Sequence, residues 1–294
     1  MSKSAYKKLP PWLKITKGKQ AGIRHLSKTL EKNVPNSICQ EARCPNRYDC
    51  FQKGILTFMI LGTTCTRNCA FCSVAHGKPL PPDRSESKKI INAIKILKIK
   101  FAVLTSPNRD DLPDGGADHY AYIINEIKKN HPHTKVEVLI PDFQGNFNDL
   151  KTVLNANPDV LNHNMETVPS LYRVARRGSL FTRSLSILKE SKAISPNTKT
   201  KSGLMVGLGE STEELLTTFE TIAKAKVDIL TIGQYLKPDK NNLEVEKYYT
   251  PNEFEKLKKN AEKMGFKYVF SGPLVRSSYL AEHVFNESLP STVN

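Results

Sequence analysis

Six cysteines are the residues of this chain most able to do chemistry, and all six fall between positions 39 and 72 of the 294 residues. They form two groups with short spacings, Cys39-x4-Cys44-x5-Cys50 and Cys65-x3-Cys69-x2-Cys72. The N-terminal segment is basic and lacks the apolar core of a secretory signal, so we expect a cytoplasmic protein. In that reducing compartment, closely spaced cysteines indicate metal or redox chemistry rather than disulfides.

Zinc is one metal that so many thiols could bind, because a structural zinc site takes four ligands in a tetrahedron. Zinc sites favour paired C-x2–4-C hooks, whereas this chain offers two groups of three. Three thiolates on one loop suit three corners of a four-iron cluster and leave its fourth iron open. We therefore favour iron–sulfur clusters, with a zinc-stabilised nucleic-acid-binding protein as the alternative.

The elements that must position these cysteines begin near residue 55, where short β-rich runs alternate with helical patterns, as in βα units with a parallel sheet. The predicted strands are Thr57–Leu61, Phe101–Thr105, Val136–Ile140, Asp159–Asn162, Gly203–Val206 and Ile229–Ile232. The predicted helices are Glu86–Lys100, Ser211–Ala225 with a capping box between Ser211 and Glu214, and Pro251–Met264. A seventh apolar run, Tyr268–Phe270, follows the last helix. The pattern predicts an α/β fold, a partial (β/α)6 barrel of the TIM type.

Three parts are expected along the chain. Residues 1–54 form an N-terminal extension with the first cysteine group, residues 55–250 form the barrel, and residues 251–294 form a C-terminal helix, strand and tail that folds over the barrel mouth. Chemistry in such barrels gathers at the carboxyl ends of the strands. The second cysteine group directly follows the first predicted strand, which would aim its open iron into the barrel mouth.

The segment Cys65-x3-Cys69-x-Phe71-Cys72 resembles the signature of the radical S-adenosylmethionine enzymes. The resemblance implies that the amino and carboxylate groups of S-adenosylmethionine chelate the open iron, and that an electron from the cluster cleaves the sulfonium to a 5′-deoxyadenosyl radical. The run Gly203–Glu210 is similar to the pattern with which these barrels hold the cofactor, which implies cofactor binding by Gly207 and Glu210. Asn164 and Gln234, at the ends of two predicted strands, are further candidates.

The first cysteine group upstream of that signature resembles the lipoyl synthase family. Further stretches resemble the family in the same order: Arg109–Gly116, Val138–Phe143, Leu161–Pro169, Leu230–Tyr235 and Ser271–Tyr279. The chain departs from the family at Pro107-Asn108 and at Arg176-Arg177-Gly178, and we expect neither departure to touch a cluster ligand.

This resemblance implies insertion of two sulfur atoms, at C6 and C8 of a protein-bound octanoyl chain, by two [4Fe–4S] clusters and S-adenosylmethionine. No side chain would act as the catalyst. Two four-iron clusters have eight irons, and six cysteines leave two irons without a thiolate. S-adenosylmethionine would take one, bound beside Cys65, Cys69 and Cys72. The family pattern assigns the other to Ser278, which would join Cys39, Cys44 and Cys50 as ligands of the auxiliary cluster.

The implied partners are octanoylated lipoyl domains of 2-oxo acid dehydrogenase E2 subunits and of the glycine cleavage H protein, with ferredoxin or flavodoxin as electron donor. Neither nucleic acid nor a membrane is expected as a partner. The net charge of +15 suits an acidic partner, although a lysine-rich solvated surface is the simpler explanation. A methylthiotransferase acting on RNA is the second enzyme hypothesis, but no C-terminal nucleic-acid-binding module is expected after residue 281.

Overall fold

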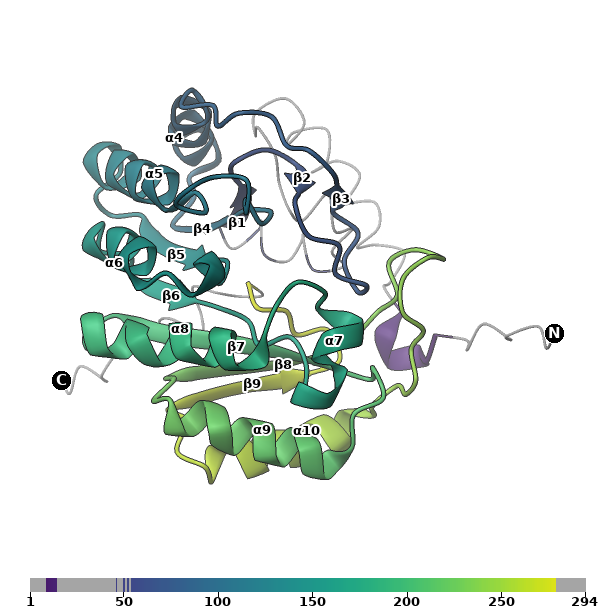
Figure 1. The fold of residues 1–294 in the computed structure, drawn as a ribbon. Coiled ribbons are helices and arrows are strands. Elements are labelled where there is room, and N and C mark those ends of the chain that lie inside the picture. The colour runs from purple at the N-terminus through teal and green to yellow at the C-terminus, as the bar shows by residue number, and fades with distance from the viewer. Residues whose placement is uncertain (1–8, 15–45, 47–49, 51, 53, 279–294) are drawn as a thin grey trace.

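The computed structural model describes residues 9–14, 46, 50, 52 and 54–278. Figure 1 shows a curved parallel sheet with helices on its outside. The strands are β1 (Ile55–Met59), β2 (Thr64–Cys65), β3 (Ala75–His76), β4 (Phe101–Thr105), β5 (Lys135–Leu139), β6 (Val160–Asn162), β7 (Lys199–Val206), β8 (Ile229–Gln234) and β9 (Tyr268–Gly272). The helices are α4 (Glu86–Leu97), α5 (Ala117–Asn130), α6 (Phe147–Asn155), α7 (Tyr172–Ala175), α8 (Phe181–Ile194), α9 (Thr212–Lys224) and α10 (Pro251–Glu262), with short 3-10 turns η1 (Pro11–Leu13), η2 (Phe143–Gly145) and η3 (Pro169–Leu171).

The main sheet confirms the predicted partial barrel. Its strand order is β1-β4-β5-β6-β7-β8-β9, and every neighbouring pair is parallel. It has seven strands rather than six, because β9 pairs with β8 from Ile229 opposite Tyr268 to Gly233 opposite Gly272. The seventh apolar run is therefore a strand of the barrel itself. Strands β1 and β9 are the two edges of the sheet in the described part of the chain.

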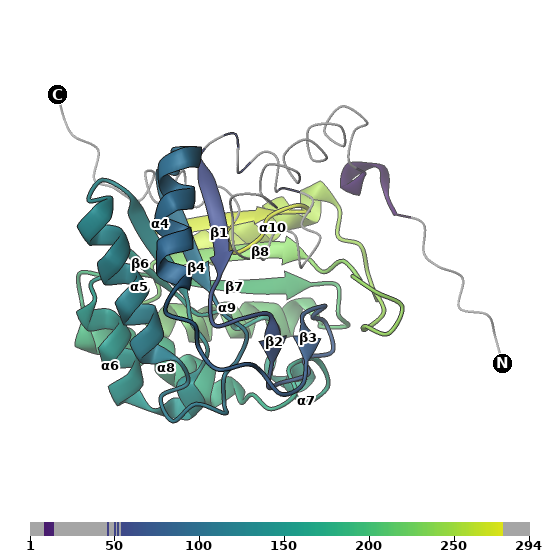
Figure 2. The ribbon, with the colours of Figure 1, turned by 90° about the horizontal axis from the view of Figure 1, so that it is seen from above.

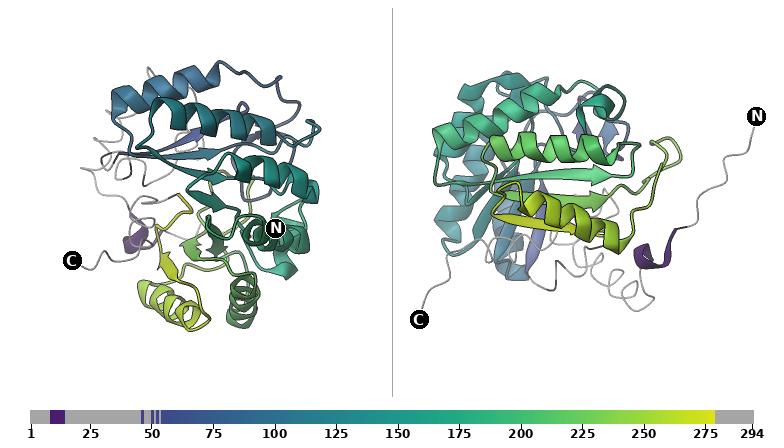
Figure 3. Two further views of the ribbon diagram at one scale, coloured as in Figure 1. Left: turned by 90° about the vertical axis from the view of Figure 1, so that its left-hand side faces the viewer. Right: turned by 90° about the horizontal axis from the view of Figure 1, so that it is seen from below.

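Helices cover the outer face of the sheet, as seen from above in Figure 2 and from two further sides in Figure 3. Residues that alternate along a strand therefore face different surroundings. In β1, Phe58 packs outward in one apolar core with Ile90 of α4, whereas Thr57 and Met59 line the interior cavity. A second apolar core, containing Leu230 of β8, packs under α9 and α10. The barrel wall is thus held from outside and leaves its inner face available for a site.

Helix ends follow the local sequence signals. The predicted capping box forms at α9, where the Ser211 side chain accepts a hydrogen bond from the Glu214 amide and Glu214 bonds back to the Ser211 amide. A second capping box, between Thr250 and Glu253, begins α10. Each box fixes where a helix starts relative to the strand before it.

The barrel interior also holds a buried ion pair. The Lys201 ammonium lies 3.0 Å from a Glu137 carboxylate oxygen, and Asn162 donates a hydrogen bond of 2.9 Å to the same carboxylate. Buried charges need partners of this kind, because an unpaired charge away from water is very costly. Separately, none of the helices in the described residues has the length and apolar character that crossing a membrane requires.

Candidate active site

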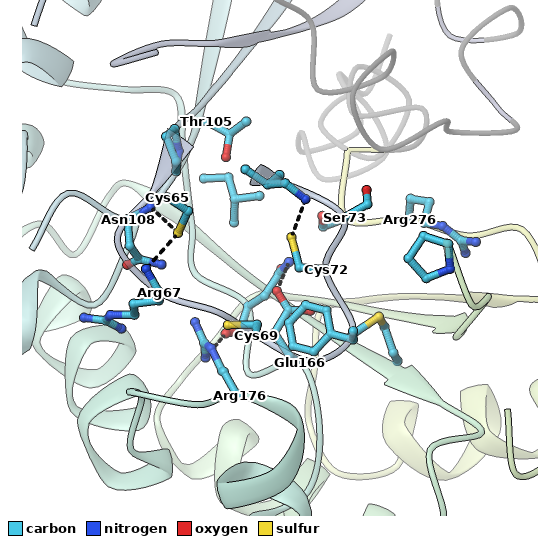
Figure 4. A pocket seen from close by; sticks show the side chains of 18 of the residues that line it. Cys65, Arg67, Cys69, Cys72, Ser73, Thr105, Asn108, Glu166, Arg176 and Arg276 are labelled. Atoms are coloured by element: carbon cyan, nitrogen blue, oxygen red, sulfur yellow. Dashed lines mark hydrogen bonds between the residues drawn. The ribbon is translucent and has the colours of Figure 1, made fainter. Parts of the chain in front are cut away.

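The second cysteine group lies on a loop closed by its own small sheet. Strand β2 ends at Cys65 and pairs with β3, so both ends of the loop are held together beyond the carboxyl end of β1. The Cys65 sulfur accepts hydrogen bonds of 3.3 Å from the amides of Arg67 and Asn108, and the Cys72 sulfur accepts one of 3.4 Å from Val74 (Figure 4). Amide donors aimed at sulfur favour the thiolate form that a cluster binds and tune its potential.

The bond from Asn108 corrects one expectation. The departure at Pro107-Asn108 was expected to touch no cluster ligand, but the Asn108 amide contacts the sulfur of Cys65. Only a backbone N–H is used, which any residue except proline supplies at this position. The departure therefore changes the side chain beside the cysteine and leaves the hydrogen bond to sulfur intact.

The thiols of this loop fit an iron–sulfur cluster. Burial raises the pKa of Cys69 to about 12 and that of Cys72 to about 11, so metal binding must displace their protons. Cys65, Cys69 and Cys72 all line one cavity, and three thiolates on one loop suit three corners of a four-iron cluster.

Arg67 anchors the cysteine loop to the barrel. Its guanidinium makes two hydrogen bonds to Asp110 after β4, of 2.6 and 2.8 Å, and two to Asp142 after β5, of 3.0 and 2.7 Å. It also donates to the hydroxyl of Ser179, at 2.9 Å. Burial alone would lower the pKa of Arg67, but the two carboxylates outweigh burial and raise it. The guanidinium therefore stays charged and fixes the loop between Cys65 and Cys69.

A cavity of about 510 Å³ opens inside the barrel beside this loop. The three cysteines of the loop line one part of it, and Arg276, Ser277 and Ser278 line another. In Figure 4, Arg276 comes from the yellow segment that follows β9, away from Cys65. Apolar side chains of Met59, Leu139 and Met205 contribute to the wall. The structure thus brings together the predicted radical-cluster cysteines and the predicted serine.

Asn164 and Glu166 form a polar group on the same cavity. The Asn164 amide donates a 3.0 Å hydrogen bond to the Glu166 carboxylate, and its own Oδ1 is buried without a partner among the described residues. Burial raises the pKa of Glu166. Glu166 has a φ of +67°, an uncommon conformation for a residue with a side chain. Buried acceptors with spare capacity are suited to a polar ligand.

Arg176 lies next to Cys69 in this polar region (Figure 4). Its guanidinium donates hydrogen bonds to the Asn164 carbonyl at 2.7 Å, to the Tyr172 hydroxyl at 2.9 Å and to the Ser184 hydroxyl at 3.0 Å. Burial works to lower the pKa of Arg176, but neighbouring acidic groups, Tyr172 and Glu166 foremost, raise it overall. A permanent positive charge therefore lies beside the cysteine loop.

The other predicted cofactor residues already have partners in the protein. The Glu210 carboxylate accepts hydrogen bonds from the amides of Gly207, at 2.6 Å, and Leu208, at 2.9 Å. The Gln234 amide donates to the carbonyls of Val206 and Lys247. A Cβ on Gly207 would lie 2.3 Å from both Gln234 and Lys247, so this glycine permits close packing within the protein. Gln234 lines the cavity, and the contact of all three residues with the cofactor stays a prediction.

The auxiliary-cluster residues are placed only in part. Cys39 and Cys44 lie outside the described residues. Cys50 is buried and packs with Ile55 and Phe101, which begin β1 and β4. Its role as a ligand stays a prediction, as does that of Ser278.

Sequence reasoning missed Arg67 and Glu166. Arg67 lies inside the cysteine signature, and its partners Asp110 and Asp142 follow predicted strands 43 and 75 residues away in sequence. The signal that could have found them was the shared position of all three residues after neighbouring strands, since carboxyl ends of parallel strands meet at one edge. Glu166 lies two residues after Asn164, in the run His163–Glu166 that follows the fourth predicted strand.

Comparison with known proteins agrees with this geometry. The family model of the radical SAM superfamily matches residues 59–222. The HydG maturase of Carboxydothermus hydrogenoformans has the same fold, with a TM-score of 0.57, 14% identity, and coverage of 92% of this chain and 78% of that one. The family match defines a radical S-adenosylmethionine enzyme. The parallel partial barrel, with three cysteines after its first strand, agrees with that class.

Closer relatives are lipoyl synthases. That of Caldicellulosiruptor saccharolyticus is 50% identical, over 94% of this chain and 96% of the relative, and that of Mannheimia succiniciproducens is 49% identical, over 93% and 86%. The chain belongs to the lipoyl synthase family. Its cofactors are accordingly S-adenosylmethionine and [4Fe–4S] clusters. The family assignment replaces both the zinc-protein and the RNA methylthiotransferase hypotheses.

Proposed function

We propose that this chain makes protein-bound lipoyl groups by inserting sulfur at C6 and C8 of an octanoyl-lysine. One observation supports this function above the others. A single cavity is lined by Cys65, Cys69 and Cys72, by the segment that carries Ser278, and by apolar side chains. Such a cavity suits an apolar acyl chain lying between a radical source and a source of sulfur.

The reaction needs chemistry that no side chain supplies, because alkyl C–H groups do not ionise at accessible pH. Bound at the cysteine loop, an iron–sulfur cluster with S-adenosylmethionine supplies a carbon radical able to remove such hydrogens. The protein's own residues must then hold the substrate carbon in place and keep water out. Met59, Leu139 and Met205 suit that task, since they offer an apolar surface without competing hydrogen-bonding groups.

Polar residues of the cavity would orient the cofactor. Asn164 offers a buried acceptor atom, Glu166 offers a half-buried carboxylate on the same cavity, and the Arg176 guanidinium holds the Asn164 backbone in place. We assign Asn164 and Glu166 to direct contact with S-adenosylmethionine. Gly207, Glu210 and Gln234 would support the cavity rim beneath the bound cofactor.

The auxiliary cluster is assigned to Cys39, Cys44, Cys50 and Ser278. A serine oxygen is a harder ligand than a thiolate and a poorer match for iron–sulfur chemistry, so it suits a position that must be released when sulfur leaves. This assignment divides the chain into the three parts predicted from sequence, residues 1–54, 55–250 and 251–294. Because β9 belongs to the barrel sheet, the third part supplies both a barrel strand and a ligand.

The substrate is an octanoylated carrier protein. We propose the lipoyl domains of 2-oxo acid dehydrogenase E2 subunits and the glycine cleavage H protein as its carriers, and ferredoxin or flavodoxin as the electron donor. A cytoplasmic location is part of the same proposal, since a reducing compartment keeps the six cysteines available as thiols. The net charge of +15 supports acidic partners.

Anaerobic incubation with S-adenosylmethionine, a reductant and an octanoyl-lysine peptide tests the proposal. Mass spectrometry should find a product in which two hydrogens of the octanoyl chain are replaced by two sulfur atoms. A hexanoyl-lysine peptide is the control, because it has no C8 position. Cleavage of S-adenosylmethionine without any sulfur in the octanoyl peptide would contradict the proposed function.

A further inference from the structure

The chain reverses direction directly after β9. The Val275 amide donates a 3.1 Å hydrogen bond to the Gly272 carbonyl, which closes a four-residue turn with Pro273 at its second position. Proline is preferred there because its ring presets the required φ. We call Gly272–Val275 the return turn and Arg276–Ser278 the return segment. The return segment lines the cavity, so the turn is what brings it back to the barrel interior.

The return turn packs against β8 at Gly233. A Cβ placed on Gly233 would lie 2.1 Å from the Val275 carbonyl oxygen and 3.1 Å from its carbonyl carbon. Both are backbone atoms, so no side-chain rotation relieves the overlap. Gly233 is not among the residues with positive φ, and its backbone conformation is open to other residues. Glycine is therefore needed at this position for space alone.

Asn46, in the N-terminal part of the chain, contacts the same turn. Its side chain is 2% exposed, and its Nδ2 donates a hydrogen bond to the Leu274 carbonyl. Its own carbonyl accepts a 3.1 Å hydrogen bond from the Cys50 amide. One buried residue thus links the return turn to Cys50, the last cysteine of the first group.

We propose that Gly233 and Asn46 are positioning residues that together seat the return turn, and thereby place the return segment and Ser278 in the cavity. Gly233 acts by leaving room for the Val275 carbonyl, and Asn46 acts by holding the Leu274 carbonyl. The consequence for sulfur insertion rests on the proposed function, in which Ser278 ligates the auxiliary cluster. The seating itself does not depend on that function.

Gly233→Ala tests whether the return turn needs the space at Gly233, with Gly272→Ala as the matched control. The two glycines are opposite each other in neighbouring strands, but a Cβ on Gly272 would meet only the Val275 side chain, at the ordinary distance of 3.4 Å. Hydrogen exchange is measured on the full chain without clusters. Overpacking against backbone should unseat the turn, so exchange of peptides covering 272–278 should rise by about tenfold in Gly233→Ala and stay unchanged in Gly272→Ala.

Asn46→Asp gives an independent test, because it keeps the size of the side chain and removes its N–H donor. It should also accelerate exchange in 272–278, even where Gly233→Ala does not fold. After cluster reconstitution, Asn46→Asp and any folded Gly233→Ala should still cleave S-adenosylmethionine, since the loop of Cys65 is untouched, while lipoyl product falls.

Exchange in Gly233→Ala and Asn46→Asp equal to that of the wild type would overturn the seating proposal. If exchange is faster in these variants but the wild-type chain makes no lipoyl product, the seating proposal stands and the proposed function is overturned. Lipoyl product at wild-type yield from variants with an unseated turn would show that seating does not serve sulfur insertion, and would overturn that part of the proposal.

Discussion

At the residue scale, the two cysteine groups are predicted to have separable roles. Replacing Cys65, Cys69 or Cys72 by Ala should abolish reductive cleavage of S-adenosylmethionine, because each change removes a ligand from the loop that faces the cavity. Replacing a cysteine of the first group, for example Cys50, should retain cleavage and abolish sulfur insertion. Chromatography of 5′-deoxyadenosine and mass spectrometry of the octanoyl peptide measure the two steps. Cleavage that survives in Cys69→Ala contradicts the assignment of the radical site.

The two adjacent serines provide a second prediction. Both line the cavity, so position alone does not separate them. If Ser278 is the ligand, Ser278→Ala should lower lipoyl product by about tenfold or more, the range for losing a group that tunes a metal site, and should leave S-adenosylmethionine cleavage intact. Ser277→Ala is the matched control and should be milder. The reverse ranking of the two variants would assign the ligand to Ser277.

Residue types and short spacings were readable from the sequence, whereas long-range partners were not. The cysteine signature lies on a loop at the carboxyl end of β1, as its position after an apolar run predicted. The use of Gln234 to hold backbone could not be read, because it depends on where the segment at Lys247 packs. Glu210 bonds to amides only two and three residues away, at Leu208 and Gly207. A polar side chain at a strand end looks the same in sequence whether it binds a ligand or the protein.

At the element scale, Arg67 is predicted to control the attachment of the cysteine loop to the barrel. Arg67→Met should destabilise the chain by about 3 kcal/mol, because the fully buried Asp142 carboxylate would keep only a 3.4 Å contact with Arg183 and a 3.2 Å hydrogen bond from the Gln144 amide. Urea unfolding of the cluster-free chain measures this loss. Adding Asp142→Asn should recover part of it by removing the unpaired charge. A double variant less stable than Arg67→Met alone would contradict this explanation.

Strand positions were predicted closely for β4 and β5, whereas the prediction Thr57–Leu61 lies two residues after the observed β1, Ile55–Met59. Phe101–Thr105 is matched exactly by β4, and β5 is displaced by one residue from its prediction. The start of β7 was missed because Lys199, Thr200 and Lys201 look like a polar loop in sequence. Lys201 is buried only because Glu137, two strands away, neutralises it inside the barrel. Tertiary pairing of charge therefore extends this strand beyond what its hydrophobic pattern indicates.

At the scale of the whole molecule, two segments far apart in the sequence contact each other at the barrel. Asn46 contacts the return turn, which follows the last strand of the sheet, although they are 228 residues apart. No local pattern predicts such a contact, although Gly272 and Pro273 do predict the turn itself. This contact brings residue 46, which lies between Cys44 and Cys50 in sequence, to the turn that precedes Ser278. A shared auxiliary cluster of the first cysteine group and Ser278 stays a prediction.

The net charge of +15 leads to a prediction about the encounter with the substrate. Long-range attraction accelerates association with an acidic lipoyl domain, whereas a short octanoyl-lysine peptide carries little charge to be attracted. Between about 0.1 M and about 1 M salt the screening length falls from about 10 Å to about 3 Å, so steering across the surface is lost while contacts inside the cavity are kept.

The specificity constant kcat/KM for the intact domain should therefore fall by about tenfold over this range, with little change for the peptide. Because both substrates use the same cavity, clusters and cofactor, any effect of salt on those components appears equally in the two series and cancels in their ratio. The measurement is the ratio of initial rates of lipoyl formation, domain to peptide, at several salt concentrations. A ratio independent of salt would mean that the lysines and arginines of this chain form a solvated surface without a role in recognising the carrier.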